Sequence, residues 1–324
     1  MRCPFLREAQ VKFCCASEYR KMIVRGQTDP GNERCSSPAF ITCPASKQHQ
    51  EEKPPGSRCP FLQESLAQYC SAASVVKFVP YSDPAVSRCG TSSHNYCELF
   101  LTISNPNRIL SHDAALPSLD PDDAENSVWL VDGIQTTGWH YYSPNHMWAD
   151  INEEGTCHVG VDAFLAKVLG SIERLSFTTE PGDHYPGAVV TSNGIDFPMV
   201  FPNRMNIVTT NSYLRAEPSR VVTDPYTFGW LFEGTELARD KGQEESPTRA
   251  GLIHGKLARE WMRADSLRIA EFARKRSSLG SDNNSSLMTD GGVFGGDTMK
   301  HLDEAQALLL YSEFFSPNIK WENR

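Results

Sequence analysis

Cysteines with a repeated spacing are the residues of this 324-residue sequence best suited to chemistry. The motif Arg-Cys-Pro-Phe-Leu occurs at residues 2–6 and again at residues 58–62. The gaps between the four cysteines are ten, twenty and seven residues in one copy and ten, eighteen and seven in the other. Matching outer gaps around a variable middle gap are typical of a duplicated structural unit. The eight cysteines in register are Cys3, Cys14, Cys35, Cys43, Cys59, Cys70, Cys89 and Cys97.

These eight cysteines are predicted to be metal ligands. Thiolates suit zinc and iron–sulfur clusters, because soft sulfur matches these metals. No Cys-x-x-Cys pair of the kind common in zinc sites occurs, so we favour iron–sulfur clusters of the 4Fe-4S type and keep zinc as the alternative. Arg2, Arg34, Arg58 and Arg88 each precede a candidate ligand and could offset its charge. The competing interpretation is buried free cysteines that pack as small apolar groups, which is our interpretation of Cys15 and Cys157.

The expected local structure limits how the cysteines share a centre. Pro4 and Glu8 follow Cys3 as helix-start signals, and a second helix is expected over residues 60–69. A straight helix would separate Cys3 from Cys14 by roughly 16 Å, too far for one small centre. Either the helix is short or bent, or one cysteine of each copy ligates the centre of the other, as in two-cluster ferredoxins. The division of the eight cysteines into two sets stays open.

Composition excludes several classes of function. A net charge of −9 argues against a nucleic-acid partner, and no apolar run approaches the roughly 18 residues of a membrane span. The amino terminus carries no apolar signal segment, so we expect a cytoplasmic protein whose thiols stay reduced. No phosphate-binding loop is present, and His158 and Cys157 should point to opposite faces of a strand. Because no catalytic constellation is found, the sequence favours a non-enzymatic role.

The rest of the chain predicts an α+β protein with four regions. A Cys-rich, mostly helical module covers residues 1–105, and an acidic, proline-containing linker covers residues 106–126. Short alternating segments within residues 127–235 predict a β-barrel or sandwich that contains one helix at residues 162–169. Residues 236–324 should form an amphipathic helix (252–276, buried through Leu257, Trp261 and Phe272), a Ser/Asn-rich loop (277–286) and a last helix capped by Asp297 or Thr298. This last helix is apolar enough to cover the barrel or to mediate self-association.

The middle of the chain resembles the glycine cleavage system H protein family. The motifs that carry the resemblance are His146-Met147-Trp148, Val159-Gly160-Val161, Leu169-Gly170, Asp224-Pro225-Tyr226 and Gly229-Trp230-Leu231. They fall within residues 141–234, roughly a third of the chain. The resemblance implies a lipoyl-domain-like β-barrel sandwich that packs against partner proteins, and a packed, hydrogen-bonded role for His146.

One position departs from the family pattern. In that family a lysine at a hairpin tip carries the lipoyl arm, and counting back from Pro202 places Gly194 at this position. Glycine has no amine to acylate, whereas Asn-Gly is the preferred pair for a tight hairpin turn. We therefore expect no lipoate and no carrier role of the usual kind.

Three functional hypotheses remain. The first is a non-enzymatic iron–sulfur protein for electron transfer or for redox or metal sensing, which docks to a protein partner such as a redox enzyme through the barrel. The second is an H-protein-like carrier or accessory protein of a glycine-cleavage-like or lipoate-linked system, with structural zinc. The third is a scaffold that does no chemistry.

Overall fold

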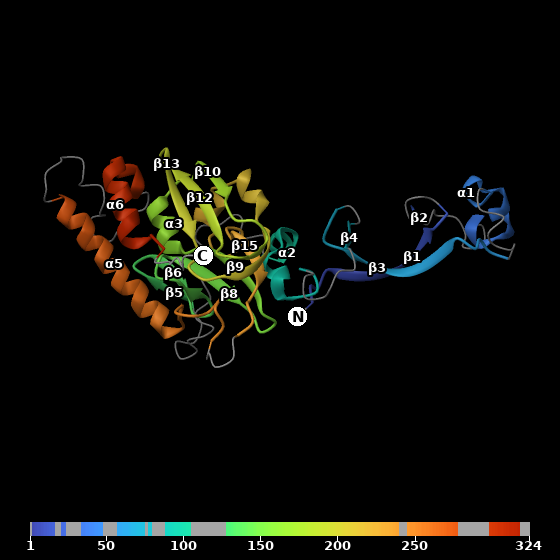
Figure 1. Ribbon diagram of the computed structural model, residues 1–324, viewed down its shortest axis with the longest axis horizontal. Helices are drawn as coiled ribbons and strands as arrows, with labels where there is room; N and C mark the ends of the chain where they lie inside the picture. The colour runs from blue at the N-terminus through green and yellow to red at the C-terminus, as the bar shows by residue number, and fades with distance from the viewer. Residues whose placement is uncertain are drawn as a thin grey trace. The chain divides into compact units, whose positions relative to one another are not determined.

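The protein is described by a computed structural model (Figure 1) that covers residues 2–16, 21–23, 34–47, 57–74, 77–79, 88–104, 128–239, 245–277 and 298–317. The chain divides into two compact units, Met1–Ser104 and Asn105–Arg324, and each is described by itself. Two predicted segments lie outside the described residues. They are the linker at residues 106–126 and the loop at residues 277–286, except for its first residue.

The first unit contains a sheet where helices were expected. Its four strands have the order β2-β1-β3-β4 and are all antiparallel. They are β1 (Leu6–Cys14), β2 (Lys21–Ile23), β3 (Leu62–Cys70) and β4 (Lys77–Val79). The prediction of a mostly helical module was wrong, because β1 and β3 pair along their whole lengths and this pairing overrides the local helix-start signals. The strand expected near residues 75–79 is present as β4.

Each copy of the cysteine motif ends in the same succession of short helices. The first copy forms the 3₁₀ helices η2 (Arg34–Ser36) and η3 (Pro38–Thr42), followed by α1 (Pro44–Lys47). The second copy forms η4 (Ser92–Tyr96) and α2 (Glu98–Ser104). The last cysteine of each copy, Cys43 or Cys97, lies between the 3₁₀ helix and the α-helix as the C-cap of the former.

The second unit consists of open antiparallel sheets covered by helices. The largest has seven strands in the order β11-β14-β15-β9-β8-β7-β16, a second has the order β10-β12-β13, and β5 pairs with β6. The expected closed barrel is therefore wrong, although the strands predicted within residues 128–210 are present. The strands are β5 (Val128–Val131), β6 (Ile134–Thr137), β7 (Tyr141–Tyr142), β8 (Met147–Ile151), β9 (Thr156–Val161), β10 (Arg174–Phe177), β11 (Gly182–His184), β12 (Gly187–Ser192), β13 (Ile195–Val200), β14 (Met205–Thr210), β15 (Phe232–Thr235) and β16 (Ile253–His254).

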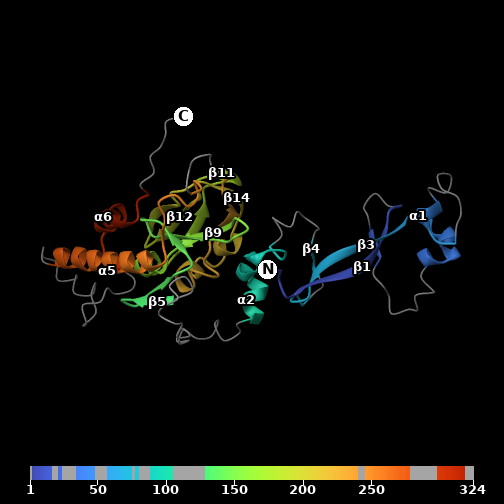
Figure 2. The same cartoon turned by 90° about the horizontal axis from the view of Figure 1, so that it is seen from below.

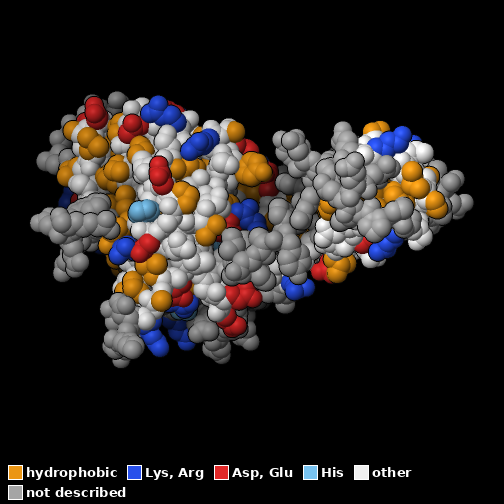
Figure 3. Space-filling view, turned by 45° about the vertical axis from the view of Figure 1, so that its right-hand side comes forward, with side chains coloured by type: hydrophobic (Ala, Val, Ile, Leu, Met, Phe, Trp, Pro, Cys, Tyr) orange, Lys and Arg blue, Asp and Glu red, His pale blue; other side chains and the backbone are white. Residues whose placement is uncertain are grey.

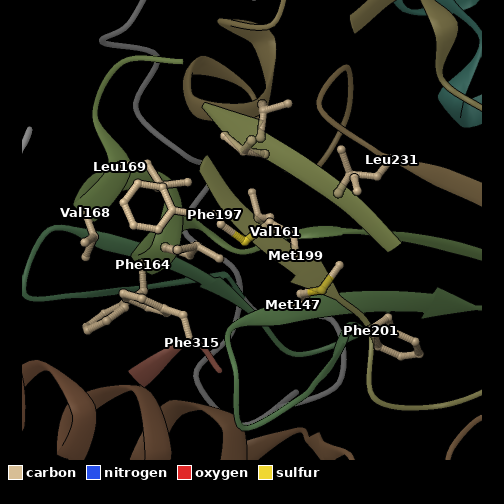
Figure 4. Close-up of a cluster of buried hydrophobic side chains, with 14 of the residues drawn as sticks. Met147, Val161, Phe164, Val168, Leu169, Phe197, Met199, Phe201, Leu231 and Phe315 are labelled. Carbon is tan, nitrogen blue, oxygen red and sulfur yellow. The ribbon is translucent and has the colours of Figure 1, made fainter. Parts of the chain in front are cut away.

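One helix interrupts the strands as predicted. Helix α3 (Ala163–Leu169) begins after Asp162, whose side chain accepts a hydrogen bond from the Leu165 N–H, and it ends at Gly170 with φ 68°. Two shorter elements, η5 (Ser212–Arg215) and α4 (Arg220–Thr223), connect β14 to β15. Figure 4 shows that α3 contributes Phe164 and Leu169 to the apolar core, beside Phe197 of β13 and Met147 of β8.

The carboxyl-terminal helices close the core from one side. Helix α5 (Lys256–Ser277) and helix α6 (Glu304–Phe314) lie side by side in both ribbon views (Figures 1 and 2), and the rings of Phe272 and Phe314 meet edge to face. Of the predicted apolar face of α5, Trp261 and Phe272 pack against the core, but its start is offset by one residue, since Leu257 is 66% exposed while Ala258 is buried. The predicted cap was also wrong: Thr298 begins the 3₁₀ helix η7 (Thr298–His301), and Asp303 caps α6 through a capping box.

Charges of both signs are mixed on the face of the protein that Figure 3 draws. On the face drawn in Figure 3, Lys and Arg side chains alternate with Asp and Glu side chains and do not gather into one basic patch. Among the described helices, none is both long and apolar enough to cross a membrane.

Candidate functional site

The ten cysteines are all free thiols and all lie within the described residues. Cys3 and Cys59, the first cysteines of the two copies, are buried, and the other six of the registered set are half-buried. Cys15 is exposed and its thiol contacts Oε1 of Gln63 at 3.2 Å. Cys157 is buried in the second unit, within β9. Cys157 is therefore buried as the structural interpretation expects, whereas the exposure of Cys15 contradicts that interpretation for Cys15.

One group of four thiols surrounds the first cysteine of the chain. The pKa of Cys89 is raised to about 11, mostly by burial and in addition by the neighbouring thiols of Cys3, Cys97 and Cys70. Arg88 opposes this shift and lowers the pKa of Cys89. Burial likewise raises the pKa of Cys3, with contributions from Cys97 and Cys70. Thiols that perturb one another in this way are neighbours, although they come from both copies of the motif.

A second group forms around Cys59. This cysteine is 5% exposed and belongs to a small apolar cluster with Phe40 and Phe61. Cys14 and Cys35 pack against the same cluster. Cys43 follows η3, and its N–H donates to the carbonyl oxygen of Phe40 at 2.9 Å. All eight predicted ligands are thus placed in the same unit.

The thiols neighbour one another without converging on a point. In the part of the chain that the structure describes, no three His, Cys, Asp or Glu side chains are arranged to hold a single metal ion. The chemistry of the donors still suits a thiolate-ligated centre, because soft sulfur ligands are the ones that zinc and iron–sulfur clusters take.

The hairpin tip in the second unit lies between β12 and β13. Ser192 pairs with Ile195, so Asn193 and Gly194 form a two-residue loop with φ 50° and φ 73°. Positive φ at both positions is the geometry of a type I′ turn, as the Asn-Gly pair predicts. A Cβ atom built on Gly194 would meet no atom within 4 Å. The tip therefore projects from the sheet, but it carries no amine to which lipoate could be joined.

The family-like motifs come together in space and have structural roles. The Trp148 indole N–H donates to the carbonyl oxygen of Pro225 at 3.1 Å. Gly160 lies beneath the same indole, and an added Cβ would be 2.8 Å from its ring. The Tyr226 hydroxyl donates to the carbonyl oxygen of Gln135 at 2.9 Å. These contacts explain why these residue types occur together. The motif residues either pack closely on one another or form hydrogen bonds.

His146 is the centre of a buried polar cluster. Its Nδ1 is 2.7 Å from Oδ2 of Asp162, and its Nε2 is 3.3 Å from Oδ2 of Asp265. The imidazole is stacked on the rings of Phe164 and Trp261. Burial lowers the pKa of His146, but the two carboxylates outweigh burial and raise the pKa above its ordinary value. The predicted packed and hydrogen-bonded role is confirmed.

The sequence did not reveal the two carboxylate partners of His146. Asp162 could have been found as a helix N-cap, since it precedes α3. Asp265 lies in the middle of α5, where nothing in the sequence distinguishes it from the exposed charges of that helix. His146 and Asp162 are fully buried and Asp265 is 3% exposed, so the three side chains pack within the core of the second unit.

Comparison with known proteins shows that residues 140–246 match the model of one family, the Glycine cleavage H-protein. The Glycine cleavage system H protein of Hydrogenovibrio crunogenus is 30% identical over 95 residues, which cover 28% of this chain and 74% of that protein. The corresponding protein of Klebsiella pneumoniae subsp. pneumoniae is 32% identical over 97 residues, again 28% of this chain and 74% of the relative. A crystal structure of a glycine cleavage system H protein from Mycobacterium marinum is 22% identical, covers 40% of this chain and 98% of that chain, and has a TM-score of 0.32.

Proposed function

The chain belongs to the glycine cleavage H-protein family through residues 140–246, and from this premise we propose that it is a non-lipoylated accessory protein of a glycine-cleavage-like or lipoate-linked system. Its H-protein-like domain docks onto partner proteins without carrying an intermediate. Its amino-terminal unit binds metal through thiolates, in the form of iron–sulfur clusters.

The observation that carries the docking proposal is the open, amine-free hairpin tip. The domain keeps the motif contacts around Trp148 and Tyr226, which hold its strands and connecting segments together. It has Gly194 at the position where the family resemblance expects the acylated lysine, and the surroundings of Gly194 leave room for a side chain. The tip has room for a side chain but lacks the amine that would attack a lipoyl donor. The domain can therefore keep its fold without carrying lipoate.

The first test is the intact mass of the chain co-expressed with a lipoate-attaching enzyme. We expect no lipoyl adduct on the unsubstituted protein. Gly194→Lys is the matched variant, because it restores an amine at the tip without a clash at Cβ. An adduct on any lysine of the unsubstituted chain would overturn the proposal of a non-lipoylated protein.

The second test is competition in a reconstituted glycine cleavage reaction. A docking domain that carries nothing should inhibit the reaction in proportion to its concentration, and added lipoylated H protein should relieve the inhibition. Absence of inhibition at a large excess of this chain would contradict docking to the same partners.

The proposal of iron–sulfur binding rests on the two groups of neighbouring thiols in the first unit. A reducing cytoplasm, as the sequence predicts, would keep these thiols available. Bound as thiolates, they would supply the ligands of clusters that serve electron transfer or redox or metal sensing. Iron and acid-labile sulfide in equal amounts on anaerobically purified protein would support this part of the proposal. Zinc without sulfide would replace it by a structural zinc module.

A further inference from the structure

The two copies of the cysteine motif are related by the pairing of their strands. Strand β1 runs antiparallel to β3 in a register that pairs Leu6 with Cys70 and Cys14 with Leu62. The last residue of β1, Cys14, therefore lies beside the first residue of β3. The last residue of β3, Cys70, lies beside the first residue of β1. This register is symmetric: exchanging the two copies reproduces the same pairs.

Backbone hydrogen bonds extend this symmetry to the loops that carry the other cysteines. The N–H of Cys3 donates to the carbonyl oxygen of Cys89 at 2.9 Å, and the N–H of Cys59 donates to that of Cys35 at 2.9 Å. Both bonds join the first cysteine of one copy to the third cysteine of the other. They hold the first cysteine of each copy away from the third cysteine of its own copy.

The final cysteines, in contrast, are bonded within their own copies. The Cys97 N–H donates to the carbonyl oxygen of His94 at 3.0 Å, as the Cys43 N–H does to that of Phe40 at 2.9 Å. His94 and Phe40 are both buried. Each final cysteine is thereby tied to the 3₁₀ helix of its own copy, next to the third cysteine of that copy.

We infer that the first unit holds two iron–sulfur centres, each ligated by three cysteines of one copy and the first cysteine of the other. One ligand set is Cys3, Cys70, Cys89 and Cys97. The other is Cys14, Cys35, Cys43 and Cys59. On binding, each thiol gives up its proton and coordinates iron as a thiolate. The inference rests on the iron–sulfur part of the proposed function and is independent of the docking part.

Neighbouring thiols support this division over one centre per copy. The Cys3 N–H donates to the carbonyl oxygen of Cys89, and the thiols of Cys3, Cys70 and Cys97 lie close enough to Cys89 to act on it. Cys14 and Cys35 instead pack with Cys59. The crossed arrangement also accounts for the equal spacing of the two copies, because each must complete the other's site.

A pair of double variants distinguishes the crossed from the uncrossed arrangement. We expect Cys3→Ala with Cys89→Ala to remove both ligands from one centre and to halve the iron and sulfide retained after anaerobic reconstitution. Cys3→Ala with Cys35→Ala should damage both centres and abolish retention. The opposite pattern, in which the second variant loses half and the first loses all, would overturn the inference. Cys15→Ser is the matched control, since the second copy has Ser71 at this position, and it should retain all of the iron.

Cross-linking of the reduced, metal-free protein tests the same division without any metal. A short bifunctional thiol reagent such as dibromobimane, followed by peptide mass spectrometry, should join Cys3 to Cys89 and Cys59 to Cys35. Links from Cys3 to Cys35 and from Cys59 to Cys89 would contradict it, even if the double variants fail to fold. If the expected links form but the unsubstituted chain retains neither iron nor sulfide, the iron–sulfur proposal fails while the grouping of the thiols stands.

Discussion

The two units of this protein differ in what can hold them together. Among the described residues of the first unit, six hydrophobic residues are buried, and two of these are the cysteines Cys3 and Cys59. The second unit has one cluster of 33 buried hydrophobic residues that includes side chains from its sheets, α3, α5 and α6. A domain with little apolar burial usually needs a disulfide, a metal or a partner to stabilise it. No disulfide joins the ten described cysteines, so under the proposal that they bind metal, the metal would be the element that stabilises the first unit.

Removal of metal should have the largest effect and should act on the first unit alone. Because ligand binding contributes directly to folding in small metal-dependent domains, we expect iron chelation under reducing conditions to abolish the amide protection of β1 and β3. The strands of the second unit should keep their protection. Hydrogen exchange followed by mass spectrometry checks both regions in one sample. Protected β1 and β3 amides in the metal-free protein would show that the first unit folds without metal.

The buried ion cluster provides the largest expected effect of a single substitution in the second unit. Asp162→Ala removes the nearer of the two carboxylate partners of the buried His146 and also removes the N-cap of α3. We expect a loss of about 4 kcal/mol in the free energy of unfolding of the second unit. Denaturant unfolding followed by Trp fluorescence measures the loss.

The matched control for this substitution is Glu271→Ala. Glu271 pairs with Lys275 at 2.9 Å, and both side chains are more than half exposed, so its removal should leave the unfolding transition almost unchanged. Iron content should be the same in both variants. A fall in iron content after Asp162→Ala would show that the stabilities of the two units are coupled, against the comparison drawn above.

His140 should make the second unit less stable in mild acid. Burial lowers the pKa of His140 to about 3, whereas an unfolded histidine has a pKa near 6.5. Below pH 6.5 the unfolded chain therefore binds a proton that the folded chain does not, and this stabilising contribution is lost as the pH falls toward 3. Between pH 7 and pH 5 the expected loss from His140 is about 2 kcal/mol.

The variant His140→Phe isolates this effect, because His146 titrates in the opposite sense. The raised pKa of His146 gives stability that is present at low pH and is lost as the pH rises through the folded pKa. A phenylalanine at position 140 keeps a ring against Tyr226 and Trp148, and Thr137 keeps its hydrogen bond to Tyr142. The difference in unfolding free energy between the two proteins should shrink by the same 2 kcal/mol from pH 7 to pH 5. A constant difference would show that His140 does not titrate on unfolding in this range.

The contrast between the units also explains what the sequence could and could not predict. In the second unit, strands, turns and α3 follow local signals such as the alternation before Asn193-Gly194 and the Asp162 and Gly170 boundaries. In the first unit, Pro4 and Glu8 are local helix signals, but β1 is formed by pairing with β3, a partner more than fifty residues away. The duplicated spacing identified the repeat. It could not show which thiols of the two copies lie close together.

The offset in α5 has a similar cause. The apolar residues Leu257 and Leu267 are each more than 60% exposed, whereas Asp265 is buried beside His146. The buried face of α5 combines the apolar Met262 and Ile269 with Asp265, so one charged position lies within the stripe that faces the core. A charged residue that is buried against a partner can be recognised only when the structure shows where that partner lies.

The smallest expected effect is at the hairpin tip. Gly194 has φ 73° and open space around its Cβ position, so Gly194→Ala should cost only the left-handed backbone conformation, about 1 kcal/mol. Gly194→Asn is the matched variant, because asparagine adopts this conformation more readily, and it should cost less than alanine. Thermal unfolding of the second unit measures both, and neither should change iron retention. If alanine costs no more than asparagine, the left-handed turn is not what requires glycine at this position.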